Sequence, residues 1–193
     1  MSGGCNRSRI LGLVWAVGCG TAADPPHTGT PDTETTPTTP LAPGERVVVD
    51  AGSWVAQSAT DDPFATERPA DVDCPEWGYF EEDGVLEINT DICDYAAIEQ
   101  PLLAPVYATD VLRVDWWHAP LFSDPPSEAH IAIGLGDEVL WETTLPVPAD
   151  AHVEGLELPV STDHDTGEPA WIHLHNHGSN TYNFVNFVAR PAD

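Results

Sequence analysis

The 193-residue chain contains no lysine, and its six arginines are outnumbered by 32 aspartates and glutamates. The formal net charge of −26 at pH 7 repels phosphate backbones, so the composition excludes nucleic-acid binding. The missing lysine also excludes P-loop nucleotide binding, Schiff-base chemistry and Ser-Lys catalysis, because each of these depends on that side chain.

Familiar catalytic motifs are missing as well. The sequence has no G-x-S-x-G elbow and no H-E-x-x-H zinc motif. It contains an H-x-H element, but residues 178–181 hold no acid at the spacing that a cupin-type metal site uses. The sequence therefore identifies no enzyme, and it favours a binding module over a catalyst.

No apolar run reaches the roughly 20 residues of a membrane-spanning helix. The run at residues 10–17 follows two arginines and is closed by Gly18 and Cys19. A basic patch, a short apolar core and the A-V-G-C ending resemble the bacterial lipoprotein lipobox. The resemblance implies a signal peptide over residues 1–18 and a palmitate-bearing lipid anchor at Cys19. An ordinary secretory signal with a chance cysteine is the alternative.

Residues 19–44 follow as a linker rich in threonine and proline. Such a segment buries too little apolar surface to offset its ordering entropy, so we expect a disordered tether after the lipidated Cys19. This layout predicts an exported domain held at a bacterial membrane, in the outer membrane or at the cell surface.

Residues 45–193 are predicted to form one all-β domain. Short β-rich runs recur there between turns containing Gly, Pro and Asp, a pattern typical of an antiparallel β-sandwich such as a jelly roll. The expected strands are Val47–Val49, Val85–Asn89, Tyr95–Leu102, Val111–His118, His130–Leu135, Val139–Leu145, Val153–Val160, Trp171–His177 and Tyr182–Ala189.

Two cysteines, Cys74 and Cys93, lie in this domain. In an exported chain an even pair is expected to form a disulfide. The alternative, a two-cysteine metal site, requires closer spacing. The bridge is expected to tie a hairpin around Tyr79–Ile88 to the strand that begins near Tyr95.

The chemistry-bearing residues concentrate on alternating strands. The segment Trp171–His177 alternates strictly, so its tryptophan shares one face with His173, His175 and His177. The same reasoning places His130 on an outward face of its own strand.

In the segment Val111–His118, alternation leaves Arg113, Asp115 and Trp117 outward. If this strand lies in one sheet with Trp171, a single solvent face carries both tryptophans beside the histidines. Flat rings flanked by hydrogen-bonding groups suit sugar recognition. We therefore predict ligand binding by Trp117, Trp171, Arg113 and Asp115.

A metal site is the alternative use of the histidines. Imidazoles at i and i+2 on a strand lie ~6.5 Å apart along the chain and can share an ion, whereas those at i and i+4 lie ~13 Å apart. At most two of His173, His175 and His177 can therefore bind one Zn²⁺ or other divalent metal. Partly exposed histidines without any ligand are the third interpretation. The candidate ligands on neighbouring strands are His130, Asp115 and His118.

The acidic run from Asp61 to Asp73 is interpreted as a solvated loop. The segment Asp163–Gly167 is interpreted as a solvated acidic turn, because its glycine position and missing glutamate depart from an EF-hand calcium loop.

Several segments resemble galactose-binding-like jelly rolls and carbohydrate-binding modules. They are Tyr95–Leu102 with Asp110–Val114, Ala129–Ile133 with Gly136 and Asp137, and the closing strand Asn180–Val188. The resemblance implies a carbohydrate-binding or adhesive module, often with a structural calcium ion, and no catalysis by this domain alone.

Together these features predict a lipid-anchored, exported module of the cell envelope that binds a glycan or an envelope protein through an aromatic and histidine sheet face. The alternatives are a metal-dependent enzyme or metal-binding protein using the H-x-H-x-H strand, and a purely structural envelope lipoprotein.

Overall fold

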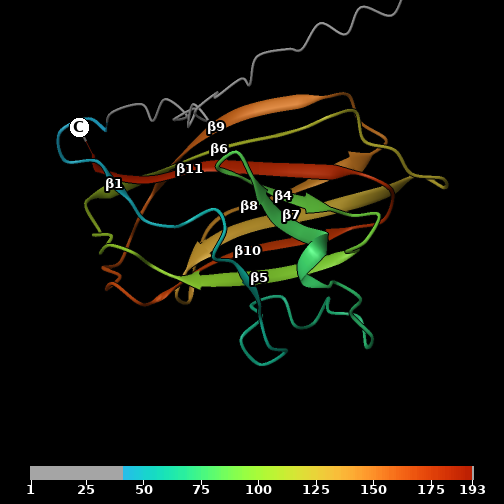
Figure 1. Ribbon diagram of the computed structural model, residues 1–193, viewed down its shortest axis with the longest axis horizontal. Coiled ribbons are helices and arrows are strands. Elements are labelled where there is room, and N and C mark those ends of the chain that lie inside the picture. Colours follow the sequence, from blue (N-terminus) through green and yellow to red (C-terminus); the bar gives the residue numbers. More distant parts are fainter. Residues whose placement is uncertain (1–40, 193) are drawn as a thin grey trace, which may run out of the picture. The chain divides into compact units, whose positions relative to one another are not determined.

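The computed structural model describes residues 41–192 (Figure 1). The predicted signal peptide, the lipid site at Cys19 and residues 19–40 of the linker lie outside the described residues. Within residues 41–192 the chain forms eleven β-strands and one short 3₁₀ helix, and no helix there has the length and apolar character of a membrane span. The all-β prediction is confirmed.

Each predicted strand has a counterpart in the structure, with ends that differ by a few residues. The two-residue strand β2 was not predicted, because Val55–Ala56 is too short to show alternation. The strand β3 was expected only as part of the hairpin around Tyr79–Ile88. The elements are β1 (Arg46–Val47), β2 (Val55–Ala56), η1 (Glu76–Gly78), β3 (Tyr79–Glu82), β4 (Val85–Asn89), β5 (Tyr95–Pro101), β6 (Asp110–His118), β7 (Ser127–Leu135), β8 (Glu138–Val147), β9 (His152–Pro159), β10 (Pro169–Asn176) and β11 (Thr181–Pro191).

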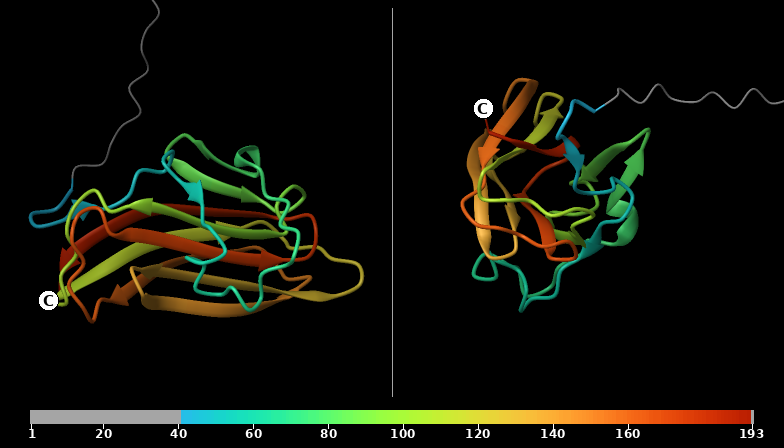
Figure 2. Two further views of the ribbon diagram at one scale, coloured as in Figure 1. Left: turned by 90° about the horizontal axis from the view of Figure 1, so that it is seen from below. Right: turned by 90° about the vertical axis from the view of Figure 1, so that its left-hand side faces the viewer.

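The strands form two antiparallel sheets packed face to face (Figure 2). The six-stranded sheet has the order β3-β4-β11-β6-β9, with β1 added to β11, and the five-stranded sheet has the order β2-β5-β10-β7-β8. From β4 to β7 each connection crosses to the other sheet, and β9, β10 and β11 cross in the same way. Crossing connections of this kind make the sandwich a jelly roll.

Alternation along the strands sends one set of side chains between the sheets and the other set outward. In β10 the inward residues are Ile172 and Leu174, which are fully buried. Their partners in register on β7 are Ile133 and Ile131, also buried. On the six-stranded sheet, Trp116 of β6 is buried in the same core. The predicted inward faces of these strands are confirmed.

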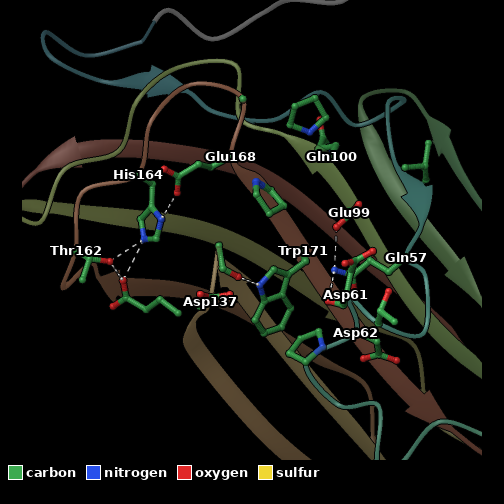
Figure 3. A pocket seen from close by; sticks show the side chains of 18 of the residues that line it. Gln57, Asp61, Asp62, Glu99, Gln100, Asp137, Thr162, His164, Glu168 and Trp171 are labelled. Carbon is green, nitrogen blue, oxygen red and sulfur yellow. Dashed lines mark hydrogen bonds and ion pairs between the residues drawn. The ribbon is translucent and has the colours of Figure 1, made fainter.

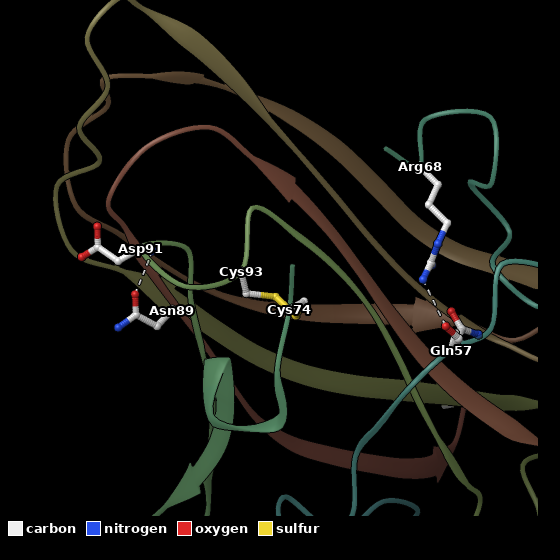
Figure 4. Close-up of a disulfide and its surroundings, with 6 residues drawn as sticks. All are labelled: Gln57, Arg68, Cys74, Asn89, Asp91 and Cys93. Atoms are coloured by element: carbon white, nitrogen blue, oxygen red, sulfur yellow. Dashed lines mark hydrogen bonds between the residues drawn. A yellow bond between two sulfur atoms is a disulfide. The ribbon is translucent and has the colours of Figure 1, made fainter. Parts of the chain in front are cut away.

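The predicted disulfide between Cys74 and Cys93 is present (Figure 4). Cys74 precedes η1 and β3, and the fully buried Cys93 lies between β4 and β5. The bridge thus ties the chain just before the β3–β4 hairpin to the segment that leads into the five-stranded sheet.

Candidate functional site

The outer face of the five-stranded sheet carries the histidines, but a long segment covers it. We call residues 57–73, between β2 and η1, the covering loop. Phe64 of this loop packs with ring centroids 4.5 Å from His173, 4.8 Å from His130 and 6.2 Å from Trp171. Trp171 is consequently only 1% exposed although it points away from the core. In Figure 1 the covering loop, drawn in teal, extends beyond β5.

A buried carboxylate fastens the covering loop to the sheet. The Asp62 carboxylate accepts hydrogen bonds from the Tyr95 hydroxyl at 2.6 Å and from Arg68 Nη1 at 3.0 Å. Burial raises the pKa of Tyr95 and the hydrogen bond to Asp62 raises it further, so the hydroxyl stays protonated and donates. Asp62 was expected to be solvated. That expectation is wrong: the side chain is buried, and the Phe64 backbone N–H is a third donor to its carboxylate, at 2.9 Å.

The covering loop contributes Glu67, whose carboxylate lies close to three histidines of the sheet. Its Oε2 lies 2.9 Å from His130 Nδ1, 3.8 Å from His173 Nε2 and 3.8 Å from His175 Nδ1. One ligand atom from each of Glu67, His130 and His173 lies within 4.8 Å of the other two. We call Glu67, His130, His173 and His175 the histidine cluster. His177, at the exposed end of the strand, lies outside this group.

Burial lowers the pKa of two histidines of the cluster, His173 and His175. It lowers the pKa of His173 to about 4, with a further contribution from His130, so His173 is a neutral imidazole at neutral pH. Burial and then His177 lower the pKa of His175 as well. His130 lies between two carboxylates: its Nε2 is 2.9 Å from Glu142 Oε1, and its Nδ1 faces Glu67.

An open groove of about 1090 Å³ lies on the same sheet, beside the covering loop. Figure 3 shows Trp171 between His164 on one side and Gln57, Asp61 and Asp62 on the other. The indole N–H of Trp171 donates to the Gly136 carbonyl at 2.9 Å. The remaining walls come from the end of β5, the β7–β8 turn and residues 161–169.

The tryptophan fits there because β7 has a glycine below it. A Cβ atom at Gly134 would overlap the Trp171 indole and the Glu138 carbonyl oxygen. The pairing of β7 with β8 shifts register between Ile133 and Gly134, which marks a bulge at the same point. The bulge and the missing side chain together let the indole lie against the strand.

Carboxylates on one wall of the groove are held in fixed orientations. Burial alone would raise the pKa of Glu138, but hydrogen bonds from Ser161, His164 and Thr162 outweigh it and lower the pKa to about 2. His164 lies 3.1 Å from Glu138 and 3.1 Å from Glu168, so it links the two carboxylates. The wall therefore presents ionised acceptors with defined directions.

The second wall is organised in the same way. Gln57 Nε2 donates to Glu99 Oε2 at 3.0 Å, and the exposed Asp61 and Asp137 lie at the rim. Among the described residues that line the groove there is no arginine. The groove is thus rich in hydrogen-bond acceptors and strongly negative.

No protein-family model and no curated protein matches this sequence. Several solved structures align with it. A family 11 carbohydrate-binding module from Clostridium thermocellum, in complex with a β-1,3-1,4-mixed-linked tetrasaccharide, aligns with 79% of this chain and 98% of its own, at 14% identity and a TM-score of 0.41. A CBM4 structure aligns with 74% of this chain and 89% of its own, at 16% identity and a TM-score of 0.34. TmCBM61 in complex with β-1,4-galactotriose aligns with 57% and 74%, at 12% identity and a TM-score of 0.32.

The expectation that Trp117 and Trp171 share one face is wrong. β6 pairs with β9 and β11, whereas β10 pairs with β5 and β7, so the two tryptophans lie on the outer faces of opposite sheets. Trp117 is half-buried, and Arg113 and Asp115 of the same strand form an ion pair at 3.0 Å. Asp115 is therefore remote from the histidine cluster.

His118 also belongs to the six-stranded sheet, where it is buried near Trp116. The sequence reasoning paired His173 and His130 in one site, and the structure brings them together. Glu67 and Phe64 were not predicted. The covering loop has no periodicity that would indicate its position, and nothing distinguishes one acid from the many others in this sequence.

Proposed function

We propose that this protein is a glycan-binding module whose ligand lies in the acidic groove beside Trp171. The observation that carries the proposal is the groove itself. At about 1090 Å³ it exceeds the ~300–1,000 Å³ of typical small-molecule pockets, so it suits a chain of sugar units better than a single small ligand.

The chemistry of the walls fits hydroxyl groups. A sugar presents many O–H donors, and a carboxylate accepts such bonds with roughly twice the strength of a neutral acceptor. Glu138 and Glu99 are already oriented by protein donors, so they lose little freedom when a ligand binds. Their remaining lone pairs supply fixed acceptors.

The same charge restricts the ligand class. An anionic glycan, such as a sulfated or uronic-acid polymer, would bring like charge to a groove lined by Asp61, Asp137 and Glu168. We therefore assign neutral oligosaccharides as the ligand class and place sugar binding in the groove, with Trp171 beneath it. Trp117, on the opposite sheet, lies outside this groove.

The test is a glycan panel of neutral, anionic and amino sugars, followed by calorimetry with the full chain. Asp61 and Asp137 are exposed, so the double variant Asp61→Ala/Asp137→Ala leaves the core untouched. Hydrogen bonds to charged groups contribute ~1.5–3 kcal/mol each. Loss of one such contact is therefore expected to lower the affinity for a neutral glycan by tenfold or more. Asp150→Ala, outside the groove, is the matched control. If the double variant binds the glycan with the wild-type affinity, the proposal that the groove is the binding site is wrong.

We further propose that the module is exported and held at the cell envelope by a lipid on Cys19. The lipobox-like segment and the disulfide between Cys74 and Cys93 support this proposal, because stable disulfides form in oxidising compartments. Cys19→Ser is expected to release the protein from the membrane fraction. Retention of the variant in that fraction would count against the anchor.

A further inference from the structure

Within residues 41–192, His173 of the histidine cluster is buried without a hydrogen-bond partner for its ring. The side chain is fully buried, yet neither ring nitrogen has a hydrogen-bond partner among the described residues. More than nine in ten buried polar groups in proteins are hydrogen-bonded, and an unsatisfied one lowers stability. A neutral imidazole retains one nitrogen lone pair, which is the group that binds a metal ion.

The distances around Glu67 match such an ion. In a tetrahedral zinc site with bonds of ~2.0–2.1 Å, neighbouring ligand atoms lie ~3.3 Å apart. Glu67 Oε2 lies 2.9 Å from His130 Nδ1 and 3.8 Å from His173 Nε2, so these separations bracket that value. The ligand atoms of His130 and His173 lie within 4.8 Å of each other, so binding of an ion requires these two side chains to move closer together.

A second carboxylate orients His130. Its Nε2 lies 2.9 Å from Glu142 on the adjacent strand β8. Metal-bound histidines commonly donate their other ring N–H to a carboxylate, which fixes the tautomer and leaves the opposite nitrogen free for the ion. When Nε2 carries the proton and donates it to Glu142, Nδ1 directs a lone pair toward Glu67. A cation between Nδ1 and the Glu67 carboxylate is then bound by both groups.

We propose that Glu67, His130 and His173 bind a divalent transition metal of the Zn²⁺ class. Two imidazoles and one carboxylate form a mixed nitrogen and oxygen set that suits Zn²⁺, whereas Ca²⁺ and Mg²⁺ prefer oxygen ligands alone. His175 Nδ1, at 3.8 Å from Glu67, is the nearest protein group for a fourth position. The site is separate from the sugar groove and goes beyond glycan binding.

The metal has a structural consequence. Glu67 belongs to the covering loop, while His130 and His173 lie on the paired strands β7 and β10. One ion therefore cross-links the loop to two strands of the sheet, and it binds the folded state alone. Zn²⁺ is expected to raise the melting temperature in a concentration-dependent way.

The experiment titrates the full chain with Zn²⁺ by calorimetry and measures the metal content after dialysis. The wild type is expected to bind one Zn²⁺ per chain, and Co²⁺ is expected to give the visible absorption of a tetrahedral site. Glu67→Gln changes a side chain that is 39% exposed and removes one ligand. We expect that variant and His130→Gln to weaken binding at least about tenfold, and Glu142→Gln to weaken it ~10–100-fold.

His152→Ala is the matched control, because it removes an exposed histidine from β9 of the other sheet. It is expected to bind Zn²⁺ like the wild type. Absence of stoichiometric Zn²⁺ in the wild type overturns the proposal, as does equal affinity in wild type, Glu67→Gln and His130→Gln. Circular dichroism of each variant separates loss of the site from loss of the fold, and glycan binding in the Glu67→Gln variant tests the groove independently.

Discussion

The contact between Tyr95 and Asp62 is expected to hold the covering loop in place. Tyr95→Phe removes a hydroxyl that lies 2.6 Å from the Asp62 carboxylate and 3.1 Å from the Phe64 carbonyl oxygen. It keeps the ring, so the packing against the histidines is preserved. Asp62 remains paired with Arg68, which limits the damage to one donor.

The size of the effect follows from the charge of the acceptor. A hydrogen bond to a charged group contributes ~1.5–3 kcal/mol, and Asp62 is buried, so its lost donor is not replaced by bulk water. For a domain of this size each kcal/mol shifts the melting temperature by ~2–4 °C, which gives a decrease of about 3–12 °C. Amide exchange over residues 58–68 is expected to accelerate more than exchange in β7 or β10.

Thermal denaturation and hydrogen exchange together measure this change. Tyr107→Phe is the matched control, since Tyr107 is 47% exposed and lies away from the covering loop. If Tyr95→Phe leaves both the melting temperature and the exchange of residues 58–68 at the wild-type values, the hydroxyl does not hold the loop and the reasoning fails.

Other perturbations test the core and the groove. Replacing Cys74 and Cys93 with alanine is expected to lower the free energy of unfolding by about 3 kcal/mol, measured by urea denaturation; an unchanged midpoint contradicts it. Gly134→Ala places a Cβ against Trp171 and is expected to cost ~1–3 kcal/mol with altered tryptophan fluorescence; wild-type stability argues against that close approach. The lowered pKa of Glu138 stabilises the fold fully above pH 4.5 and progressively less as the pH falls toward 2. Glu138→Gln is expected to flatten this acid limb of the stability profile, and an identical limb would exclude the contribution.

The fold could be predicted from the sequence because alternation is a local property. Each run of two-residue periodicity, such as Trp171–His177, fixes which side chains face the core regardless of distant segments. The pairing of strands is not local. Nothing in the alternation of Val111–His118 says which sheet holds it, so the single face with both tryptophans was the part that failed.

Only those residues of the candidate site that lie on strands could be predicted from the sequence. The positions of His130 and His173 follow from alternation on two neighbouring strands. In the register of β7 and β10, His130 pairs with His175 and Ala132 pairs with His173. Glu67, Phe64 and Asp62 come from an irregular loop, where no repeating pattern relates sequence to position. Their contribution depends on where the loop lies, and that is set by tertiary contacts alone.

The covering loop is fastened at both of its ends. β2 pairs with β5 immediately before it, and Cys74, bonded to Cys93, follows it directly. A chain segment pinned at both ends samples far fewer conformations than one with a free end. The Cys74–Cys93 bond supplies the second of these two attachments, so the position of Glu67 over the histidines depends on a covalent bond as well as on the pairing of β2 with β5.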